Sequence, residues 1–378
     1  MIDRKLLRDP MSLQKVVKSE ENRFKDTQNV YDCANLDRKI IELMFESENI
    51  QKEINIRNKE MKNLFKSLKS NENPPIENLS LDKNDSQEDI KILQEEIANL
   101  KQQKAVVDEQ IMEKNAEFDK KFKNIGCILD PRVPISKNED DATIYTKFTS
   151  KRKVTPILQF PDIMEKMECV DMKRGSKVAG HRGYFLIEEL GLLENALVRY
   201  SIDFLRKKDY KLIQAPVLVN KEIMERTCQL NDFDEQLYSA GEFYLCATSE
   251  QPISGLYMNE RLTDQDLPKK FAGQSLCFRK EAGAAGKDNR GIFRVHQFEK
   301  IEQFIICKPD DSEKHHTEMI ETSIEFYKSL DISFNVIRIV SGDMNDSAAL
   351  KYDLEASFPF TKNFRELVSA SNCSDYQS

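Results

Sequence analysis

The chain has 378 residues, with 57 Lys and Arg against 65 Asp and Glu, which gives a net charge of −8 at pH 7. That length allows two or three domains, and the acidic balance excludes a protein that binds nucleic acid through its overall charge, so such binding would need a local basic patch. No run of 18 apolar residues and no apolar signal-peptide core is present, which predicts a cytoplasmic chain with no membrane partner. Eight scattered cysteines without a C-x-x-C pair and four histidines without zinc-ligand spacing predict a reduced chain with no zinc site.

Residues 35–125 carry two heptad repeats, which are separated by a helix-breaking segment at 71–85. Eight of ten repeat positions between 36 and 68 are apolar, and so are eight of eleven between Ile90 and Ile125. The pattern predicts an antiparallel coiled-coil hairpin, an arm on the order of 50 Å long. Such an arm could dimerise the protein or bind another molecule, and the periodicity leaves both open.

A basic stripe lies near the distal end of the first predicted helix, where five cations face only Glu60. It can follow the phosphates of a nucleic acid, or it can be an ordinary solvated helix face. Its members are Arg57, Lys59, Lys62, Lys66 and Lys69.

Residues 129–153 contain Pro, Asp and Lys and predict a linker, after which a helix is expected over 161–172. Four apolar residues then recur at helical spacing and predict a helix with a core-facing side. The following KLIQAPVLV predicts a strand that ends or bends at Pro216. The four apolar residues are Leu193, Leu197, Tyr200 and Phe204.

The segment ATSEQP, at 247–252, is expected to open a helix that follows a strand. Thr248 or Ser249 is the predicted N-cap, and the free backbone N–H groups of that helix could bind an anion. A simple helix cap explains the segment equally well.

Residues 278–304 predict an antiparallel hairpin with a long turn at 282–291. Alternation places Arg279 and Glu281 on one face of the first limb, and Arg294, Phe298 and Glu302 on one face of the return limb. Guanidinium groups suit phosphate oxygens, a phenyl ring can stack on a purine, and a carboxylate can hold an ammonium group. A surface hairpin with solvated charges is the alternative, but it leaves the combination FR-x-E, loop, R-x-x-x-F unexplained.

This string resembles the second signature motif of class II aminoacyl-tRNA synthetases, and GIFRVHQFEKIEQF is similar to seryl-tRNA synthetases of the eukaryotic cytosolic type. The string T-S-E at 248–250 resembles the serine-binding loop of that family, and the helix, strand and Pro216 resemble its first motif, the main dimer interface. The IEEL stretch departs from the small residues usual in the family. The resemblance implies an α+β fold, an antiparallel β-sheet flanked by helices, with an N-terminal α-helical coiled-coil arm that binds tRNA.

The resemblance also implies the site residues. ATP would contact Arg279, Lys280, Glu281, Arg294, Val295, Phe298, Glu366, Leu367, Val368 and Ser369. Serine would contact Thr248, Ser249, Glu250, Arg279 and Glu302, and the catalytic set would be Arg279, Glu281, Arg294 and Glu302. Mg2+ would bind Glu366 and Ser369, two oxygen ligands three residues apart, because this cation keeps most of its waters. Asp353 and Glu355 remain open between a site role and a structural one.

These observations predict a tRNA-binding domain at 1–128, a linker at 129–153 and a class II catalytic domain at 154–378. The expected activity is a serine–tRNA ligase: a homodimer that uses ATP and Mg2+ to activate L-serine and transfers it to tRNA(Ser) and tRNA(Sec). The sequence stops at Ser378, before the family's third motif, so we expect this chain to aminoacylate poorly. A non-catalytic, synthetase-derived protein that dimerises and binds tRNA is therefore the alternative.

Overall fold

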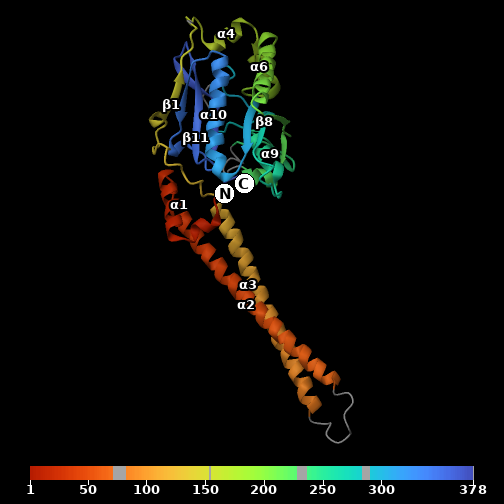
Figure 1. The fold of residues 1–378 in the computed structure, drawn as a ribbon. Coiled ribbons are helices and arrows are strands. Elements are labelled where there is room, and N and C mark those ends of the chain that lie inside the picture. Colours follow the sequence, from red (N-terminus) through yellow and green to blue (C-terminus); the bar gives the residue numbers. More distant parts are fainter. Residues whose placement is uncertain (71–81, 153–154, 228–235, 283–289, 378) are drawn as a thin grey trace. The chain divides into compact units, whose positions relative to one another are not determined.

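The computed structural model describes residues 1–70, 82–152, 155–227, 236–282 and 290–377 (Figure 1). The chain divides into two compact units. One comprises residues 3–18 and 26–125, and we call it the arm unit; the other comprises residues 1–2, 19–25 and 126–378, and we call it the catalytic unit. No helix in the described ranges is both long and apolar enough to cross a membrane.

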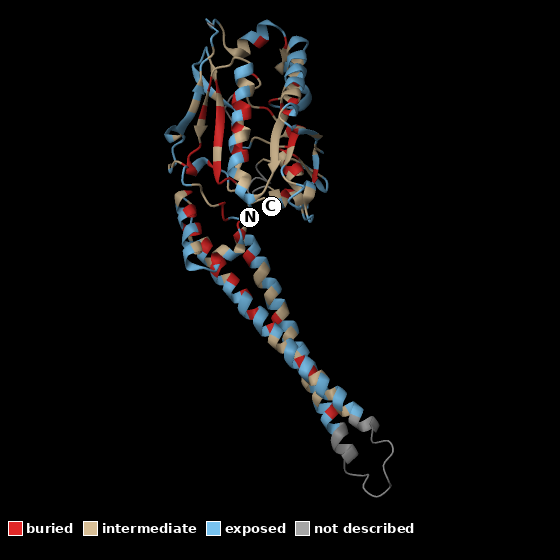
Figure 2. Ribbon diagram, in the orientation of Figure 1, coloured by how far each residue is buried: buried red, intermediate tan, exposed pale blue. Residues whose placement is uncertain are grey.

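The arm unit is built on two long antiparallel helices, α2 (Gln28–Ser70) and α3 (Asp82–Phe122). Every heptad position whose side chain is described is buried or half-buried, so the two apolar stripes form one continuous seam (Figure 2). With 43 and 41 residues, the helices are about 60 Å long, somewhat longer than the repeats predict.

A short N-terminal segment packs against the base of this hairpin. It comprises η1 (Arg4–Leu7) and α1 (Pro10–Asn22), the end of which lies in the catalytic unit. The carboxylate of Asp37, on α2, is almost fully buried and accepts hydrogen bonds from Arg4 and from Arg8, whose Nε lies 2.8 Å away. Burial alone would raise the pKa of Asp37, but the two guanidinium groups outweigh it and lower this pKa.

The catalytic unit contains a four-stranded antiparallel sheet in the order β1-β10-β11-β12. Its helix α10 (Ser312–Ser329) buries Ile320 and Ile324 against Val336 and Leu354 in the largest hydrophobic core (Figure 2). The strands span β1 (Thr143–Phe148), β10 (Phe334–Arg338), β11 (Leu350–Phe358) and β12 (Asn363–Asn372). Strand β1 lies inside the segment predicted as a linker, so part of that segment belongs to the sheet.

A second sheet has the order β4-β8-β9, in which β4 (Lys211–Gln214) is parallel to β8 (Lys269–Phe278). Strand β9 (Gln297–Ile306) is antiparallel to β8, so the predicted hairpin is confirmed. Its strands meet the turn earlier than expected, since Arg279, Glu281 and Arg294 lie outside both of them. Helix α6 (Glu189–Arg206) buries Leu205 beside Tyr210 and Ala272 of this sheet. The side-chain amide of Gln303 in β9 donates to the Met319 carbonyl of α10 at 3.1 Å, which ties the second sheet to the helix that backs the first.

Two small sheets complete the unit: β2 (Val170–Asp171) with β3 (Phe185–Leu186), and β5 (Leu218–Asn220), β7 (Phe243–Leu245) and β6 (Ser239–Ala240). The break at Pro216 is confirmed, because β4 and β5 belong to different sheets. The helix predicted over 161–172 is wrong as a single element. It is divided into α4 (Phe160–Lys166) and α5 (Met172–Ala179), because Glu168 has a left-handed backbone (φ 53°).

The predicted core face of α6 is wrong for three of its four residues, since only Phe204 is half-buried, with its ring centre 5.4 Å from that of Phe326. The side chains of Leu193, Leu197 and Tyr200 are exposed, at 61% for Leu193, whereas the buried residues of the helix are Ile202 and Leu205. Helical periodicity reports that a face is apolar but not what covers it.

Candidate active site

The T-S-E loop leads from β7 into the short helix α9 (Glu250–Ser254) and surrounds one carboxylate, that of Glu302 on β9. Thr248 Oγ1 lies 2.9 Å from both carboxylate oxygens, and the Ser249 hydroxyl donates to one of them. The predicted cap is partly wrong, because Ser249 makes no capping bond and only Thr248 accepts from the Glu250 N–H, at 3.3 Å. That N–H also donates to Glu302 at 2.9 Å, so the anion at this helix start is a side chain of the protein itself.

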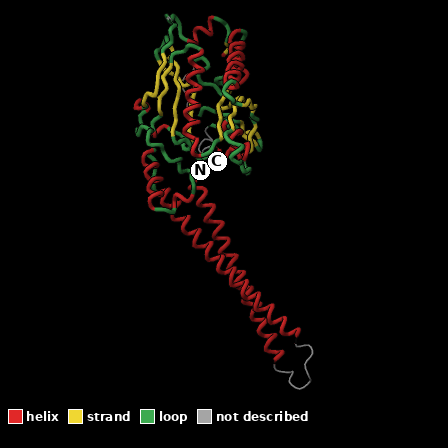
Figure 3. The backbone as a smooth tube through the Cα atoms, in the orientation of Figure 1, coloured by secondary structure: helices red, strands yellow, loops and turns green. Residues whose placement is uncertain are grey.

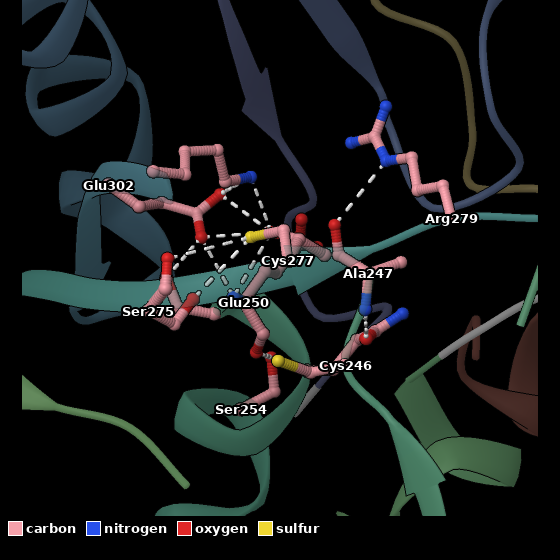
Figure 4. A network of polar contacts seen from close by, with 12 residues as sticks. Cys246, Ala247, Glu250, Ser254, Ser275, Cys277, Arg279 and Glu302 are labelled. Carbon is pink, nitrogen blue, oxygen red and sulfur yellow. Dashed lines mark hydrogen bonds and ion pairs between the residues drawn. The ribbon is translucent and has the colours of Figure 1, made fainter. Parts of the chain in front are cut away.

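Lys300 provides the only ammonium group on Glu302 among the described residues. Its Nζ lies 2.7 Å from the Glu302 carboxylate and 2.5 Å from Thr248 Oγ1. Burial alone would raise the pKa of Glu302, but the Lys300 charge and the hydroxyl groups of the loop outweigh it and lower this pKa. Glu302 is therefore an ionised carboxylate at the centre of a polar network (Figure 4).

A second carboxylate, Glu250, borders this network. Its side chain accepts a hydrogen bond from the Gln377 amide at 2.6 Å. Burial and the negative charge of Glu302 raise the pKa of Glu250. The pKa values of the two carboxyl groups are therefore shifted in opposite directions: Glu302 keeps its charge, and Glu250 holds a proton more readily.

Arg279 follows directly after β8, and its side chain extends to the main chain of Ala247, the residue before the T-S-E loop (Figure 4). Its Nε lies 3.4 Å from the Ala247 carbonyl oxygen, and its guanidinium carbon lies 5.1 Å from the centre of the Phe298 ring. The guanidinium group therefore lies between the loop that resembles a serine site and the aromatic ring expected to stack on adenine.

Arg294 precedes β9 and forms an ion pair with Glu281, with 2.6 Å between the closest nitrogen and oxygen. The sequence places both residues at ATP, but the structure joins them to each other. The Nε of Arg294 is buried and has no hydrogen-bond partner among the described residues, so one donor of this guanidinium group is unpaired. The main-chain carbonyl of Arg294 accepts from Arg182 at 3.0 Å, which fixes the position of its backbone.

Four oxygen-bearing side chains share one face of the β11–β12 pair. The register places Asp353 opposite Ser369 and Glu355 opposite Glu366, with an irregularity between them that brings Glu366 and Ser369 to the same side. Burial raises the pKa of Asp353 to about 7, and one of its carboxylate oxygens is buried with no hydrogen-bond partner in the part of the chain that the structure describes. Hard oxygen donors on an open face suit Mg2+.

The neighbouring predicted ATP contacts differ in exposure. Leu367 is exposed, whereas Val368 packs on the hydrophobic core behind the sheet and can reach a ligand only through its backbone. Val295 is buried at the start of the return limb, and the Lys280 N–H donates to the Gln236 carbonyl at 2.9 Å. In the described ranges, no three His, Cys, Asp or Glu side chains form a closed metal cluster.

Sequence reasoning missed two members of the site. Lys300 has the same strand parity as Phe298 and Glu302, so the alternation that found those two could have found it. Gln377 is 127 residues away from Glu250, and no local pattern indicates that contact.

On the arm unit, the structure separates the basic stripe into two parts. Arg57 occupies a half-buried position at the seam and lies 3.0 Å from Glu96 on α3 and 3.1 Å from Glu60. Lys59, Lys62 and Lys66 are exposed on the outer side of α2, and the side chain of Lys69 lies outside the described residues.

The fold and these motifs define a class II aminoacyl-tRNA synthetase, and residues 233–378 match the tRNA synthetase class II core domain (G, H, P, S and T). A serine–tRNA ligase of Encephalitozoon cuniculi is 54% identical over 267 residues, 69% of this chain and 61% of the relative. The cytoplasmic serine–tRNA ligase of Schizosaccharomyces pombe is 40% identical over 95% of this chain and 78% of the relative. The chain therefore belongs to the serine–tRNA ligase family.

Two solved structures are similar over the whole chain. The cytoplasmic serine–tRNA ligase of Naegleria fowleri in complex with AMP is 37% identical with a TM-score of 0.85, and this chain covers 86% of it. Seryl-tRNA synthetase of Pyrococcus horikoshii complexed with ATP is 30% identical with a TM-score of 0.83, and this chain covers 85% of it. The predicted fold class is confirmed.

Proposed function

We propose that the protein uses ATP to activate L-serine as seryl-adenylate and then transfers the seryl group to tRNA(Ser). The observation that carries this proposal is the row formed by the Glu302 network, the Arg279 guanidinium and the Phe298 ring. An ammonium acceptor, a phosphate-binding fork and an aromatic plate follow one another in the order that an aminoacyl-adenylate requires. The related structures solved with AMP and with ATP support an adenine nucleotide at this site.

At the serine end, Glu302 and Thr248 would hold the ammonium group, with Ser249 and Glu250 completing the wall of the pocket. Arg279 would contact both the serine carboxylate and the α-phosphate. Attack of that carboxylate on the α-phosphorus releases pyrophosphate, and a ribose hydroxyl of tRNA later displaces AMP. No protein nucleophile is needed, because positioning and charge stabilisation carry the chemistry.

At the nucleotide end, Phe298 would stack on adenine, with Glu281, Lys280 and the Val295 backbone beside it. Arg294, with its unpaired buried Nε, would hold the outer phosphates. Glu366 and Ser369 would hold Mg2+ beside the phosphates, and the backbone of Leu367 and Val368, which lie between them in the sequence, would contact the nucleotide. When bound, Mg2+ would neutralise phosphate charge. Asp353, which lies opposite Ser369 across the two strands, would change the net charge of this site when it gains or loses its proton.

The exposed face of α6 supports a homodimer. Leu192, Leu193, Leu197 and Tyr200 are all exposed on this helix, and a contiguous exposed apolar face is typical of an interaction site. We propose that a second copy covers this face. Sedimentation should show a dimer that Leu193→Glu converts to a monomer, whereas Arg199→Glu, on the same helix, should not dissociate it as completely.

For the arm unit, we propose tRNA binding through the exposed lysines Lys59, Lys62 and Lys66, in a cytoplasmic protein. A coiled coil that serves only dimerisation would not need a group of exposed cations on its outer side. The relatives at this level of identity are ligases, which favours the enzyme over a non-catalytic tRNA-binding protein.

Serine-dependent exchange of pyrophosphate into ATP tests the activation step. The protein should support exchange with serine but much less with alanine, which would leave the hydroxyl partner of a serine site unpaired, or with threonine, which adds a methyl group. Glu302→Gln should lower exchange by at least about tenfold, since a charge-assisted bond to the ammonium is lost. Glu299→Gln, on the other face of β9, is the matched control, and equal exchange with all three amino acids would contradict the proposal.

A further inference from the structure

The amine subsite of the proposed function already contains an ammonium group. Lys300 Nζ lies 2.7 Å from Glu302 and 2.5 Å from Thr248 Oγ1. These are the same two side chains to which the serine ammonium is assigned. Substrate and lysine therefore need the same acceptors.

The Glu302 carboxylate has no acceptor position to spare. It receives Thr248, the Ser249 hydroxyl, the Glu250 N–H and Lys300, and a carboxylate offers about four lone-pair sites. A second ammonium can bind only where one of these donors leaves. Net charge leads to the same conclusion, because one carboxylate balances one cation.

Of the four donors, Lys300 is the one that can withdraw. The Glu250 N–H is fixed by the backbone, and Ser249 is fully buried on a short side chain. Lys300 has a flexible four-carbon stem and a side chain that is 29% exposed, so its ammonium can return to water by bond rotation.

We infer that Lys300 is an internal substitute for the serine ammonium, which occupies the amine subsite when the site is empty and leaves it when serine binds. The inference rests on the proposed function. In the empty site, Lys300 keeps the buried Glu302 charged and its hydrogen-bond donors in place, so the pocket is formed before substrate arrives. The cost is competition: serine must displace a cation that is held within the same molecule.

Two other roles for Lys300 predict different behaviour. If Lys300 were a permanent structural bridge, its removal would weaken the binding of every ligand of the pocket. A direct contact to the serine carboxylate would make Lys300 important for ligands that carry this carboxylate. Three ligands distinguish these roles: serine, serinamide, which keeps the amine but lacks the carboxylate, and glycerate, which lacks the amine.

The experiment measures the dissociation constants of these ligands by calorimetry for the parent chain and for Lys300→Met. Removal of the competing cation should lower the dissociation constants of serine and serinamide by about threefold to tenfold and leave that of glycerate unchanged. The matched control is Lys270→Met on the neighbouring strand β8, where the lysine pairs with Glu318; it should change none of the three. Weaker binding of all three ligands to Lys300→Met, or of serine and glycerate together, would overturn the inference. A parent chain that binds no serine would overturn the proposed function itself.

A second measurement needs no variant. Acetylation of lysine amines, followed by mass spectrometry, reports how accessible each Nζ is, and the exposed Lys52 provides the reference rate. Saturating serine should raise the labelling of Lys300 relative to Lys52, and glycerate should not. Protection of Lys300 by serine would show that the ammonium remains in the subsite and that the inference is wrong.

Discussion

The arm unit and the catalytic unit both place carboxylates beside basic side chains, but the two kinds of ion pair differ in how much they are exposed to water. The arm pair Arg57–Glu96 has nitrogen and oxygen 3.0 Å apart, with side chains 43% and 45% exposed. In the catalytic unit, the side chain of Glu302 is 17% exposed and receives donors from a loop, a helix start and its own strand. The short distances are alike, whereas the surroundings are not.

This difference determines what each charge can do. Water screens the exposed arm charges, so that single pairs contribute little and binding depends on several cations acting together. In the catalytic unit, a buried charge is costly unless every partner is present, so a single substitution affects the whole network. The predictions below test this contrast at four places, in descending order of expected effect.

Asp353 should show the largest effect, since burial raises its pKa from 3.8 to about 7. This carboxyl is neutral in both states below pH 4, but between pH 4 and 7 the unfolded chain loses the proton first. Stability of the parent relative to Asp353→Asn should therefore fall as pH rises through that window, by on the order of 2–4 kcal/mol, and stay level above it.

Urea unfolding at several pH values, without nucleotide or divalent cations, measures this difference. The other charged groups that influence Asp353 are Lys351, Glu355 and Glu366, and they are the same in both proteins. A pH-independent difference between parent and variant would show that Asp353 is solvated like an arm carboxylate.

Arg279→Ala should weaken ATP binding by about 1.5–3 kcal/mol, because a charge-assisted contact to phosphate is lost. Arg338→Ala removes an arginine that lies beside two tyrosine rings of the other sheet, and it serves as the control. Calorimetry with ATP and Mg2+ compares the two variants. Equal affinities for Arg279→Ala and the parent would exclude Arg279 from the nucleotide site.

The outer lysines of α2 should act only together. Replacement of Lys59, Lys62 and Lys66 by Gln should lower the slope of log Kd for tRNA against log salt by about 2 to 3, roughly one for each lost phosphate contact. Replacement of Lys15, Lys39 and Lys52 in the same unit changes the net charge equally and should leave the slope nearly unchanged. The same slope for both triple variants would assign tRNA binding to general charge and not to this stripe.

The arm could be predicted from the sequence because its information is local. Each heptad of α2 and α3 repeats the same apolar positions, and the partner of each apolar residue lies on the other helix, which has the same repeat. The strands β8 and β9 were predictable for the same reason, since period 2 and a connecting turn are local signals. The start of β8 at Lys269, its end at Phe278 and the start of β9 at Gln297 required the structure.

The connections within the site were not predictable, because they depend on the approach of distant segments. The pairing of Glu281 with Arg294 depends on how the two limbs leave their strands, and the contact of Gln377 with Glu250 depends on the whole fold. The exposed face of α6 shows a further limit, since a repeat of apolar residues cannot distinguish a buried helix face from an exposed one. Motif resemblance proposes the site residues but does not say which of them contact one another.

The smallest effect should come from Arg57 and Glu96, which the sequence assigned in part to the basic stripe. Because both side chains are nearly half exposed, their coupling in a double-mutant cycle of Arg57→Ala and Glu96→Ala should be below about 1 kcal/mol by urea unfolding. Arg57→Ala should also leave the salt slope for tRNA unchanged, since this guanidinium is engaged by Glu60 and Glu96 at the seam and is not directed to the outer side. A coupling of several kcal/mol would mean that the arm seam excludes water as the catalytic site does. A reduced salt slope would instead return Arg57 to the stripe, as a cation that exchanges its carboxylate partners for phosphate.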